Sequence, residues 1–340
     1  MSKESKGKNN KNRLSKVAYL ILGLILLIAG VGMTVYRIYF LRTRMNSTDV
    51  SKDYNSTYVF VVSDIDDEFM REAYYAAKEA GKEKGVYVEL MGNGLRGSYN
   101  KIDYLTMAIA SKPDGIIVEA DESPEIKNLI NDATSAGIPV VTMLVDSSDS
   151  ERKAFIGPNY YDLGKMYGTG VYNVGSSVGI NVTVLIPENM SEANRNNIYQ
   201  GILAEANAGP KTYSIDMKLV NCESMLKTEA DIRNIIYNDK ETNIFIATNP
   251  DITTCTYQAL IDYNKISSVK YIGYYKNASV IKGISTGAVD ATVILDSEDM
   301  GNQCVQALYE CINNNYVSSY IPTGISLIDK SNVENYLTDK

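Results

Sequence analysis

The chain has 340 residues, a formal net charge of −8, no histidine and four cysteines. This acidic balance argues against a nucleic-acid partner, because proteins bind phosphate backbones through basic surfaces. The lack of histidine removes the usual general base, the Ser-His and Cys-His nucleophile pairs and most zinc sites. The cysteines show no CxxC spacing, which argues against a metal ribbon.

A candidate membrane span lies near the N-terminus. Residues 17–36 contain no charged side chain, and a helix of that length would cover about 30 Å, the thickness of a bilayer's hydrocarbon core. The basic tail at 1–16 favours a cytoplasmic N-terminus and an extracytoplasmic main domain. A cleaved signal peptide is the alternative. Because no small-x-small site follows the span, we expect a single-pass plasma-membrane anchor, with a linker at 37–56.

From residue 57, short apolar runs rich in Val and Ile alternate with segments of helical period. This alternation is typical of βαβ units and parallel sheets. In the first half we expect strands at 58–62, 86–90, 115–120 and 138–144, and helices at 68–84, 99–111 and 124–136. In the second half we expect strands at 181–186, 213–220, 243–248, 269–274, 291–295 and 323–328, and helices at 192–208, 227–239, 251–263 and 297–314.

The first strand leads into an acidic loop that contains Asp64 and Asp66. Two carboxylates at the end of a strand could hold Mg²⁺, as in the haloacid-dehalogenase-type phosphatases. That chemistry also needs a lysine and a second acidic pair in the same site, and nothing in the sequence places them there. We therefore favour a loop that accepts hydrogen bonds from a polar ligand, and keep a surface phosphatase-like enzyme as the alternative.

Several segments, in this order and spacing, resemble the type I periplasmic binding proteins, especially the ribose- and galactose-binding group. They are VSDIDDEFM, KPDGIIVEADES, AGIPVVTM, FIGPNYYDLGKMYG, IFIATNPD, YIGYY and STGAVDATVILDSEDMG. The resemblance implies two open α/β lobes with parallel sheets joined by a hinge. It places lobe 1 at 57–159 plus 296–321, and lobe 2 at 160–295 plus 322–340.

The resemblance also implies a set of ligand-binding positions. Those that match the family's pattern by position are Asp67, Phe69, Met70, Glu122, Asn159, Tyr160 and Asn249. Carboxylates and amides suit sugar hydroxyls, and aromatic rings cover the apolar face of a sugar.

Three further positions depart from the family's pattern. Tyr275 stands where the family usually has an aspartate, and Asp296 lies beside Leu295, which stands where a polar residue is expected. Arg195 lies almost one helical turn before the family's arginine position. These departures leave the identity of the ligand open.

The expected protein is a membrane-anchored, extracytoplasmic solute-binding protein without catalytic activity, metal or cofactor. We expect it to close its lobes over a small polar ligand, for which a sugar is favoured, and to present it to an ABC-type permease or signal to a sensor histidine kinase. A ligand-responsive transcription regulator shares this fold, but its N-terminus would be a helix-turn-helix rather than an apolar span.

Overall fold

The computed structural model describes residues 54–95, 97, 99–175, 179–208 and 211–337. The basic tail, the predicted membrane span and most of the linker lie outside these residues. Among the helices that are described, none combines the length and the apolar character needed to cross a bilayer. The residues from Asn55 onward form one compact unit, and the description below concerns that unit.

Lobe 1 is built on a six-stranded sheet with the order β11-β5-β4-β3-β1-β2, in which all neighbouring strands are parallel. The strands are β1 (Ser56–Val61), β2 (Val86–Leu90), β3 (Gly115–Glu119), β4 (Val140–Met143), β5 (Ala154–Gly157) and β11 (Tyr320–Pro322). Its helices are α2 (Glu68–Lys84), α3 (Lys101–Ser111), α4 (Pro124–Ser135) and α10 (Ser297–Asn314). Helix α2 occupies the range predicted from the sequence.

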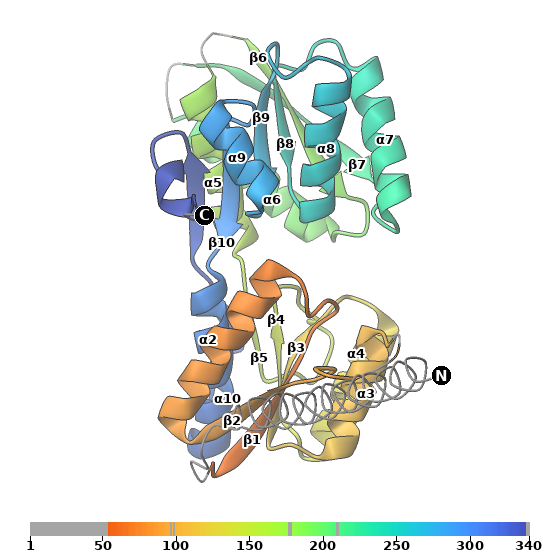
Figure 1. Cartoon of the computed structure of the whole chain (residues 1–340), viewed down its shortest axis with the longest axis vertical. Coiled ribbons are helices and arrows are strands. Elements are labelled where there is room, and N and C mark those ends of the chain that lie inside the picture. The colour runs from red at the N-terminus through yellow and green to blue at the C-terminus, as the bar shows by residue number, and fades with distance from the viewer. Residues whose placement is uncertain (1–53, 96, 98, 176–178, 209–210, 338–340) are drawn as a thin grey trace, which may run out of the picture. The chain divides into compact units, whose positions relative to one another are not determined.

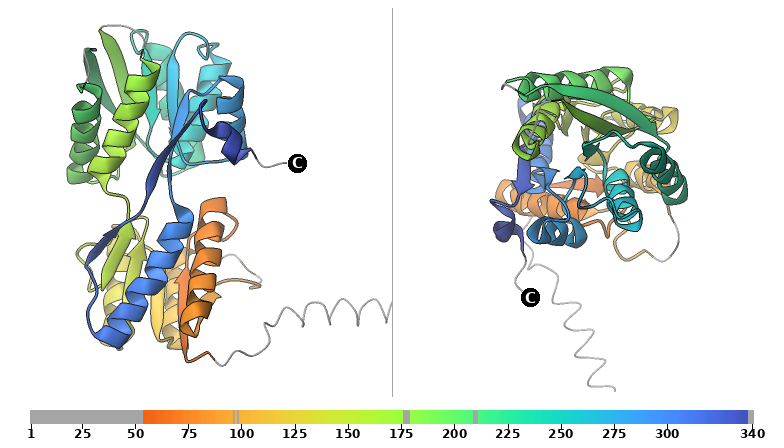
Figure 2. Two further views of the ribbon diagram at one scale, coloured as in Figure 1. Left: turned by 90° about the vertical axis from the view of Figure 1, so that its left-hand side faces the viewer. Right: turned by 90° about the horizontal axis from the view of Figure 1, so that it is seen from above.

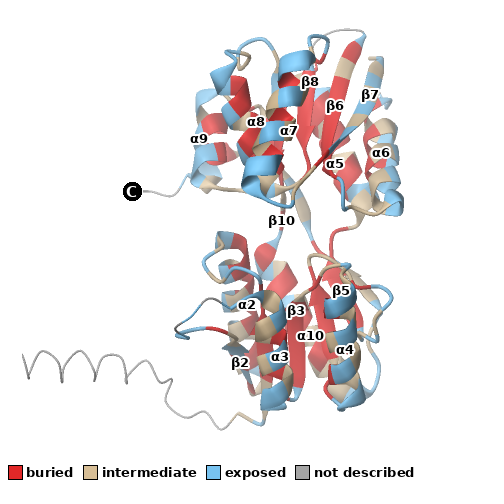
Figure 3. Ribbon diagram, turned by 90° about the vertical axis from the view of Figure 1, so that its right-hand side faces the viewer, coloured by how far each residue is buried: buried red, intermediate tan, exposed pale blue. Residues whose placement is uncertain are grey.

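The lobe 1 sheet has a hydrophobic core on each face because side chains alternate along a strand. In β1, Tyr58 and Phe60 pack with α2 and α10, whereas Val59 and Val61 pack with α3 and α4. Figure 3 shows the buried strands between helices whose outer faces are exposed. The near-continuous apolar runs of the sequence therefore reflect a sheet covered on both sides.

Lobe 2 repeats this build with the order β12-β10-β9-β8-β6-β7, in which only β10 and β12 pair antiparallel. The strands are β6 (Ile180–Pro187), β7 (Tyr213–Val220), β8 (Ile244–Ala247), β9 (Lys270–Tyr274), β10 (Ala291–Leu295) and β12 (Ile325–Asp329). The helices are α5 (Tyr160–Val174), α6 (Glu192–Ala206), α7 (Met225–Asn238), α8 (Pro250–Asp262) and α9 (Ala278–Thr286), followed by the 3₁₀ turn η1 (Val333–Tyr336).

The chain passes between the lobes after β5, after β10 and after β11, because each of these strands is followed by an element of the other lobe (Figures 1 and 2). The later crossings are tied together. Asp296 N donates to Gly324 O at 2.9 Å, and Thr323 N donates to Gly157 O at 3.0 Å. Two α/β lobes dominated by parallel strands confirm the predicted fold class.

Each lobe contains a helix pair that approaches closely through glycine. On α10, a Cβ at Gly301 would lie 2.1 Å from the carbonyl oxygen of Ala73 in α2. On α6, a Cβ at Gly201 would lie 2.2 Å from the carbonyl oxygen of Tyr161 in α5. Both distances are far below van der Waals contact, so only glycine permits these crossings.

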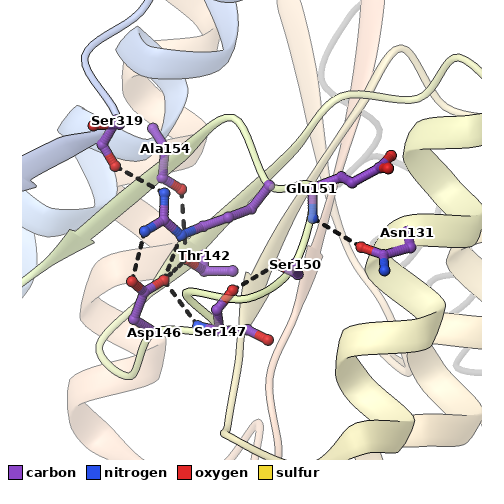
Figure 4. A network of polar contacts seen from close by, with 9 residues as sticks. Asn131, Thr142, Asp146, Ser147, Ser150, Glu151, Ala154 and Ser319 are labelled. Carbon is purple, nitrogen blue, oxygen red and sulfur yellow. Dashed lines mark hydrogen bonds and ion pairs between the residues drawn. The ribbon is translucent and has the colours of Figure 1, made fainter.

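An arginine joins the residue before β11 to the loop between β4 and β5 (Figure 4). Arg152 binds Asp146 through two guanidinium nitrogens, at 2.5 Å from Nε to Oδ1 and 2.6 Å from Nη2 to Oδ2, and its Nη1 donates to Ser319 O at 2.9 Å. Thr142 Oγ1 also donates to Asp146 at 3.1 Å. This planar, two-point contact fixes geometry that a lysine would leave free.

Candidate functional site

A hollow of about 1900 Å³ takes in the cleft between the two lobes and continues along α2 and α10 of lobe 1 as far as Lys84 and Gln306. In the cleft itself, the described lining comes from the residues that follow β1, β3 and β4 in lobe 1 and β6, β8 and β9 in lobe 2. Open parallel sheets bind ligands outside the carboxyl ends of their strands. The whole hollow is larger than the roughly 300–1,000 Å³ of pockets that enclose small molecules, so a small molecule fills only a part of it.

Asp67 begins helix α2 at the lobe 1 side of the cleft. Its Oδ1 accepts a hydrogen bond from the backbone N–H of Met70 at 2.9 Å, which caps the helix. Phe69 and Met70 also line the cleft, although both are largely buried. One carboxylate oxygen of Asp67 therefore holds the helix, and the other faces away from it.

That second oxygen accepts a hydrogen bond from Tyr275 of lobe 2. The Tyr275 oxygen also accepts from the backbone N–H of Phe69 at 3.3 Å. Burial, followed by the hydrogen bond to Asp67, raises the pKa of Tyr275 above its usual range. Tyr275 has a φ of 82°, a conformation that non-glycine residues adopt rarely. The residue that replaces the expected aspartate thus reaches across to the opposite lobe.

A second polar contact joins the lobes at the adjacent residue. Lys276 Nζ of lobe 2 lies 2.7 Å from Oε1 of Glu72 on α2. The other oxygen of Glu72 accepts from Ser297 Oγ at 2.6 Å. Both side chains of the ion pair are about one third exposed, so the pair itself contributes little free energy but sets the register of the lobes.

The loop after β3 presents two adjacent carboxylates to the cleft. Asp121 is neutralised by Lys101, with Nζ 2.7 Å from Oδ2, and accepts a hydrogen bond from the backbone N–H of Ser123. Burial opposes ionisation of Asp121, but the hydrogen bonds from Lys101 and Ser123 outweigh it and lower the pKa. Glu122 is exposed at the cleft and has no such partner among the described residues.

The negative charge of this loop affects the pKa of Tyr160. Burial, followed by the negative charges of Glu122 and Asp146, raises the pKa of Tyr160 to about 12. The tyrosine begins α5 and lines the cleft. It therefore supplies a neutral hydroxyl and a ring face beside a free carboxylate.

Asn249 is the main amide on the lobe 2 side. Its Oδ1 accepts from the backbone N–H of Ile252 at 2.7 Å and caps α8. Its Nδ2 lies 3.8 Å from Sγ of Cys222, whose thiol pKa is raised by burial. The weak sulfur contact leaves the amide nitrogen available as a donor to a ligand.

Most of the residues that the sequence resemblance implied lie together. The residues that line the cleft are Asp67, Phe69, Met70, Glu122, Tyr160, Asn249, Tyr275 and Asp296. Asn159 instead caps α5 and lines a smaller hollow of about 310 Å³. Arg195 lines neither hollow, whereas its neighbour Asn194 lines the cleft.

Sequence reasoning missed several polar residues of the lining: Glu72, Asn189, Asn194 and Lys276. The position of Asn194 could have been predicted, because Ser191 caps α6 and so fixes which residues of the helix share a face. One residue turns a side chain by about 100° around a helix, which separates Asn194 from Arg195. No local pattern in the sequence pairs Glu72 with Lys276.

The acidic loop does not assemble a metal site among the described residues. Asp64 Oδ1 accepts from the backbone N–H of Asp66 at 2.9 Å, so one carboxylate shapes its own turn. No group of three or more potential cysteine, aspartate or glutamate ligands occurs in the described part of the chain.

The model of the periplasmic binding protein domain matches residues 58–315. No curated protein sequence matches the chain.

Solved structures share the fold. A glucose-galactose binding protein from Geobacillus stearothermophilus, GanP, has 22% identity and a TM-score of 0.70, covering 81% of this chain and 98% of its own. An arabinose binding protein from the same organism, AraP, has 21% identity and a TM-score of 0.70, with coverages of 83% and 99%. The XylFII-LytSN complex contains a chain with 24% identity and a TM-score of 0.64, with coverages of 81% and 98%.

Proposed function

The chain belongs to the periplasmic binding protein domain family, and from this premise we propose that its cleft binds a small sugar on the outer side of the plasma membrane. It is a binding protein rather than an enzyme. The observation that carries the proposal is the cleft itself, in which carboxylates, amides and aromatic rings from two lobes converge.

The chemistry of the lining suits a polyhydroxylated ring. Carboxylate oxygens such as that of Asp67 accept hydrogen bonds from hydroxyls, and the amide nitrogen of Asn249 donates to ring or hydroxyl oxygens. Phe69 and Tyr160 offer apolar surface to the C–H face of a sugar. Binding proteins named for glucose, galactose and arabinose share the fold, which supports a sugar of this size.

The proposed mechanism is closure of the lobes about the crossing segments. The two walls of the cleft belong to different lobes, which are joined by the three crossing segments. A ligand that contacts both walls favours the closed state by the difference between its affinities for the two states.

The proposed placement is a tether with a membrane partner. The apolar span at 17–36 would hold the binding unit at the outer surface, beside an ABC-type permease or a sensor histidine kinase. One protein of the same fold is known in a complex, XylFII-LytSN, which supports a protein partner for the closed form. Co-purification with each class of partner, with and without sugar, distinguishes transport from sensing.

The first test is a ligand screen on the full chain in detergent. We expect one or a few pentoses or hexoses, from a panel that includes glucose, galactose and arabinose, to raise the thermal unfolding temperature by several degrees through mass action. Small-angle X-ray scattering should show a smaller radius of gyration with the same sugar. A panel without any stabilising sugar would contradict the proposal.

The second test asks whether the cleft is the binding site. Asn249→Ala should weaken binding of the sugar at least tenfold by calorimetry. Because this change also removes a helix cap, Asn277→Ala is the matched control: Asn277 caps α9 in the same way, accepting from Val280 N at 2.8 Å, and is not part of the described cleft lining. Equal losses of affinity in both variants would show that the cap, not the site, matters.

Asp67 is tested in the same way against the cap of another lobe 1 helix. Asp67→Ala should also reduce affinity at least tenfold. Asn100→Ala, which uncaps α3 away from the described cleft lining, should leave affinity unchanged. Unchanged affinity in both cleft variants would remove the site assignment.

A further inference from the structure

The two walls of the cleft differ in charge. Lobe 1 contributes ten carboxylates to the described lining of the hollow. Two of them, Glu79 and Glu83, lie in the C-terminal half of α2, and those nearer the cleft are Asp64, Asp67, Glu72, Glu119, Asp121, Glu122, Asp296 and Glu298. Lobe 2 contributes one, Asp251, together with amides such as Asn189, Asn194 and Asn249. One wall is therefore strongly anionic, and the other is largely neutral and polar.

Few cations offset this charge within the cleft. The basic residues of the described lining are Lys84, which ends α2 at the opposite end of the helix from the cleft, and Lys276, which is engaged. Lys84 Nζ lies 5.0 Å from the ring centroid of Tyr309, and Lys276 pairs with Glu72. Arg195, the cation that the sequence places near this site, is not part of the lining. The described cleft thus offers an anionic ligand group no uncommitted basic side chain.

The loop after β3 presents one carboxylate with a partner and one without. Asp121 is paired with Lys101 at 2.7 Å, but Glu122 forms no hydrogen bond or ion pair with a described residue. Both Glu122 and Tyr160 line the cleft, and the charge of Glu122 contributes, after burial, to the raised pKa of Tyr160. A carboxylate beside an aromatic ring is a suitable environment for an ammonium group, which is attracted to both.

Closure of the lobes raises the free-energy cost of leaving the Glu122 carboxylate without a partner. In the open cleft Glu122 is solvated, but a closed lobe pair removes water from the carboxylates that face the ligand. Burying a charge without a partner is strongly unfavourable, whereas burying it against an opposite charge with hydrogen bonds is not. Lys276 and Glu72 show that the lobe 1 wall already accepts one ammonium from the opposite lobe.

From this arrangement we infer that the ligand is an amino sugar, a monosaccharide that carries a protonated amino group. The amino group lies against Glu122 and the Tyr160 ring, and the hydroxyls meet the amides of lobe 2. This inference rests on the proposed sugar-binding function and specifies the charge of the sugar.

The test compares ligands that differ mainly in charge. D-galactosamine, D-galactose and D-galacturonate are titrated into the full chain in detergent at pH 7, and the series is repeated with D-glucosamine, D-glucose and D-glucuronate. In at least one series we expect the amino sugar to bind at least tenfold more tightly than the neutral sugar, and the acid not to bind measurably. High salt should reduce the advantage of the amino sugar.

A variant assigns the effect to a residue. Glu122→Gln keeps the shape of the side chain and removes its charge, so the ratio of the affinity for the amino sugar to that for the neutral sugar should fall at least fivefold. Glu125→Gln is the matched control, because Glu125 is exposed on the first turn of α4 and is not part of the described lining. It should leave both affinities unchanged.

The outcomes separate the two proposals. If the neutral sugars or the sugar acids bind as tightly as the amino sugars, the charge inference is wrong and sugar binding stands. An undiminished preference for the amino sugar in Glu122→Gln contradicts the assignment to Glu122. If no sugar of either series binds and the wider panel also fails, both the inference and the proposed function fail.

Discussion

The two lobes are alike in construction and unlike in what they present to the cleft. Each has a six-stranded sheet of the same strand pattern, a core on both faces and one glycine-mediated helix pair. Yet nearly all the cleft carboxylates come from lobe 1, and the amides come mainly from lobe 2. The framework is thus repeated, and the loops at the strand ends carry the functional difference.

The largest expected change in stability tests whether the two lobes depend equally on their glycine-mediated helix pairs. Gly301→Ala in lobe 1 and Gly201→Ala in lobe 2 each place a Cβ within about 2 Å of a backbone oxygen, and each should destabilise its own lobe by about 2–3 kcal/mol. Urea unfolding followed by circular dichroism measures the loss.

Gly170→Ala on α5 is the control for the glycine pair. Its nearest neighbour would be Cδ1 of Ile272 at 3.0 Å, the flexible end of a side chain, so its stability should stay within about 1 kcal/mol of the parent. If only one of the two close-contact variants lost stability, the glycine-mediated helix pair would matter for the stability of one lobe and not of the other.

A smaller effect tests the contacts that join the lobes. Tyr275→Phe combined with Lys276→Met removes the hydrogen bond to Asp67 and the ion pair with Glu72, and should lower the cooperativity of thermal unfolding, so that calorimetry resolves two transitions. Lys270→Met removes an ion pair with Asp290 inside lobe 2 and should leave a single transition. One sharp transition in the double variant would assign lobe coupling to the crossing segments alone.

The smallest effect concerns lobe 2 alone. Tyr167 and Tyr271 are both fully buried, but the Tyr167 hydroxyl has no hydrogen-bond partner, whereas the Tyr271 hydroxyl donates to Thr253 O at 2.7 Å. Tyr167→Phe should therefore raise the free energy of unfolding by about 1 kcal/mol, and Tyr271→Phe should lower it by a similar amount. Equal losses in both would show that the Tyr167 hydroxyl is not unpaired in solution.

The strands and long helices could be predicted because their patterns are local. Helix α2 was predicted over its whole length, since Glu68 to Lys84 combines an N-cap, helical period and a closing glycine. Helices α5 and α9 and the short strands β5 and β11 were not predicted from pattern. Helix α5 contains Gly164, Gly168 and Gly170, which weaken its helical signal, and close packing against α6 compensates for them.

The site could be predicted where function coincides with a strand end. Asp67, Glu122 and Asn249 each follow a strand, so topology alone brings them to one edge. Arg195 does not line the described cleft, because the direction of its side chain depends on helix phase. The contact between Glu72 and Lys276 joins residues far apart in sequence. Such a contact follows from packing, which single-sequence patterns do not contain.

The late return of the chain to lobe 1, through α10 and β11, bears on how the protein folds during synthesis. Helix α10 supplies Met300, Cys304 and Leu308 to the core of lobe 1, and β11 adds the final strand of its sheet, which Arg152 fastens. A ribosome-bound chain that stops before Ser297 leaves the apolar face of α2 uncovered. The half of the molecule that is made first is therefore completed only by residues near the end of the chain, just before β12 completes the sheet of lobe 2, so neither lobe is finished until almost all of the polypeptide has been translated.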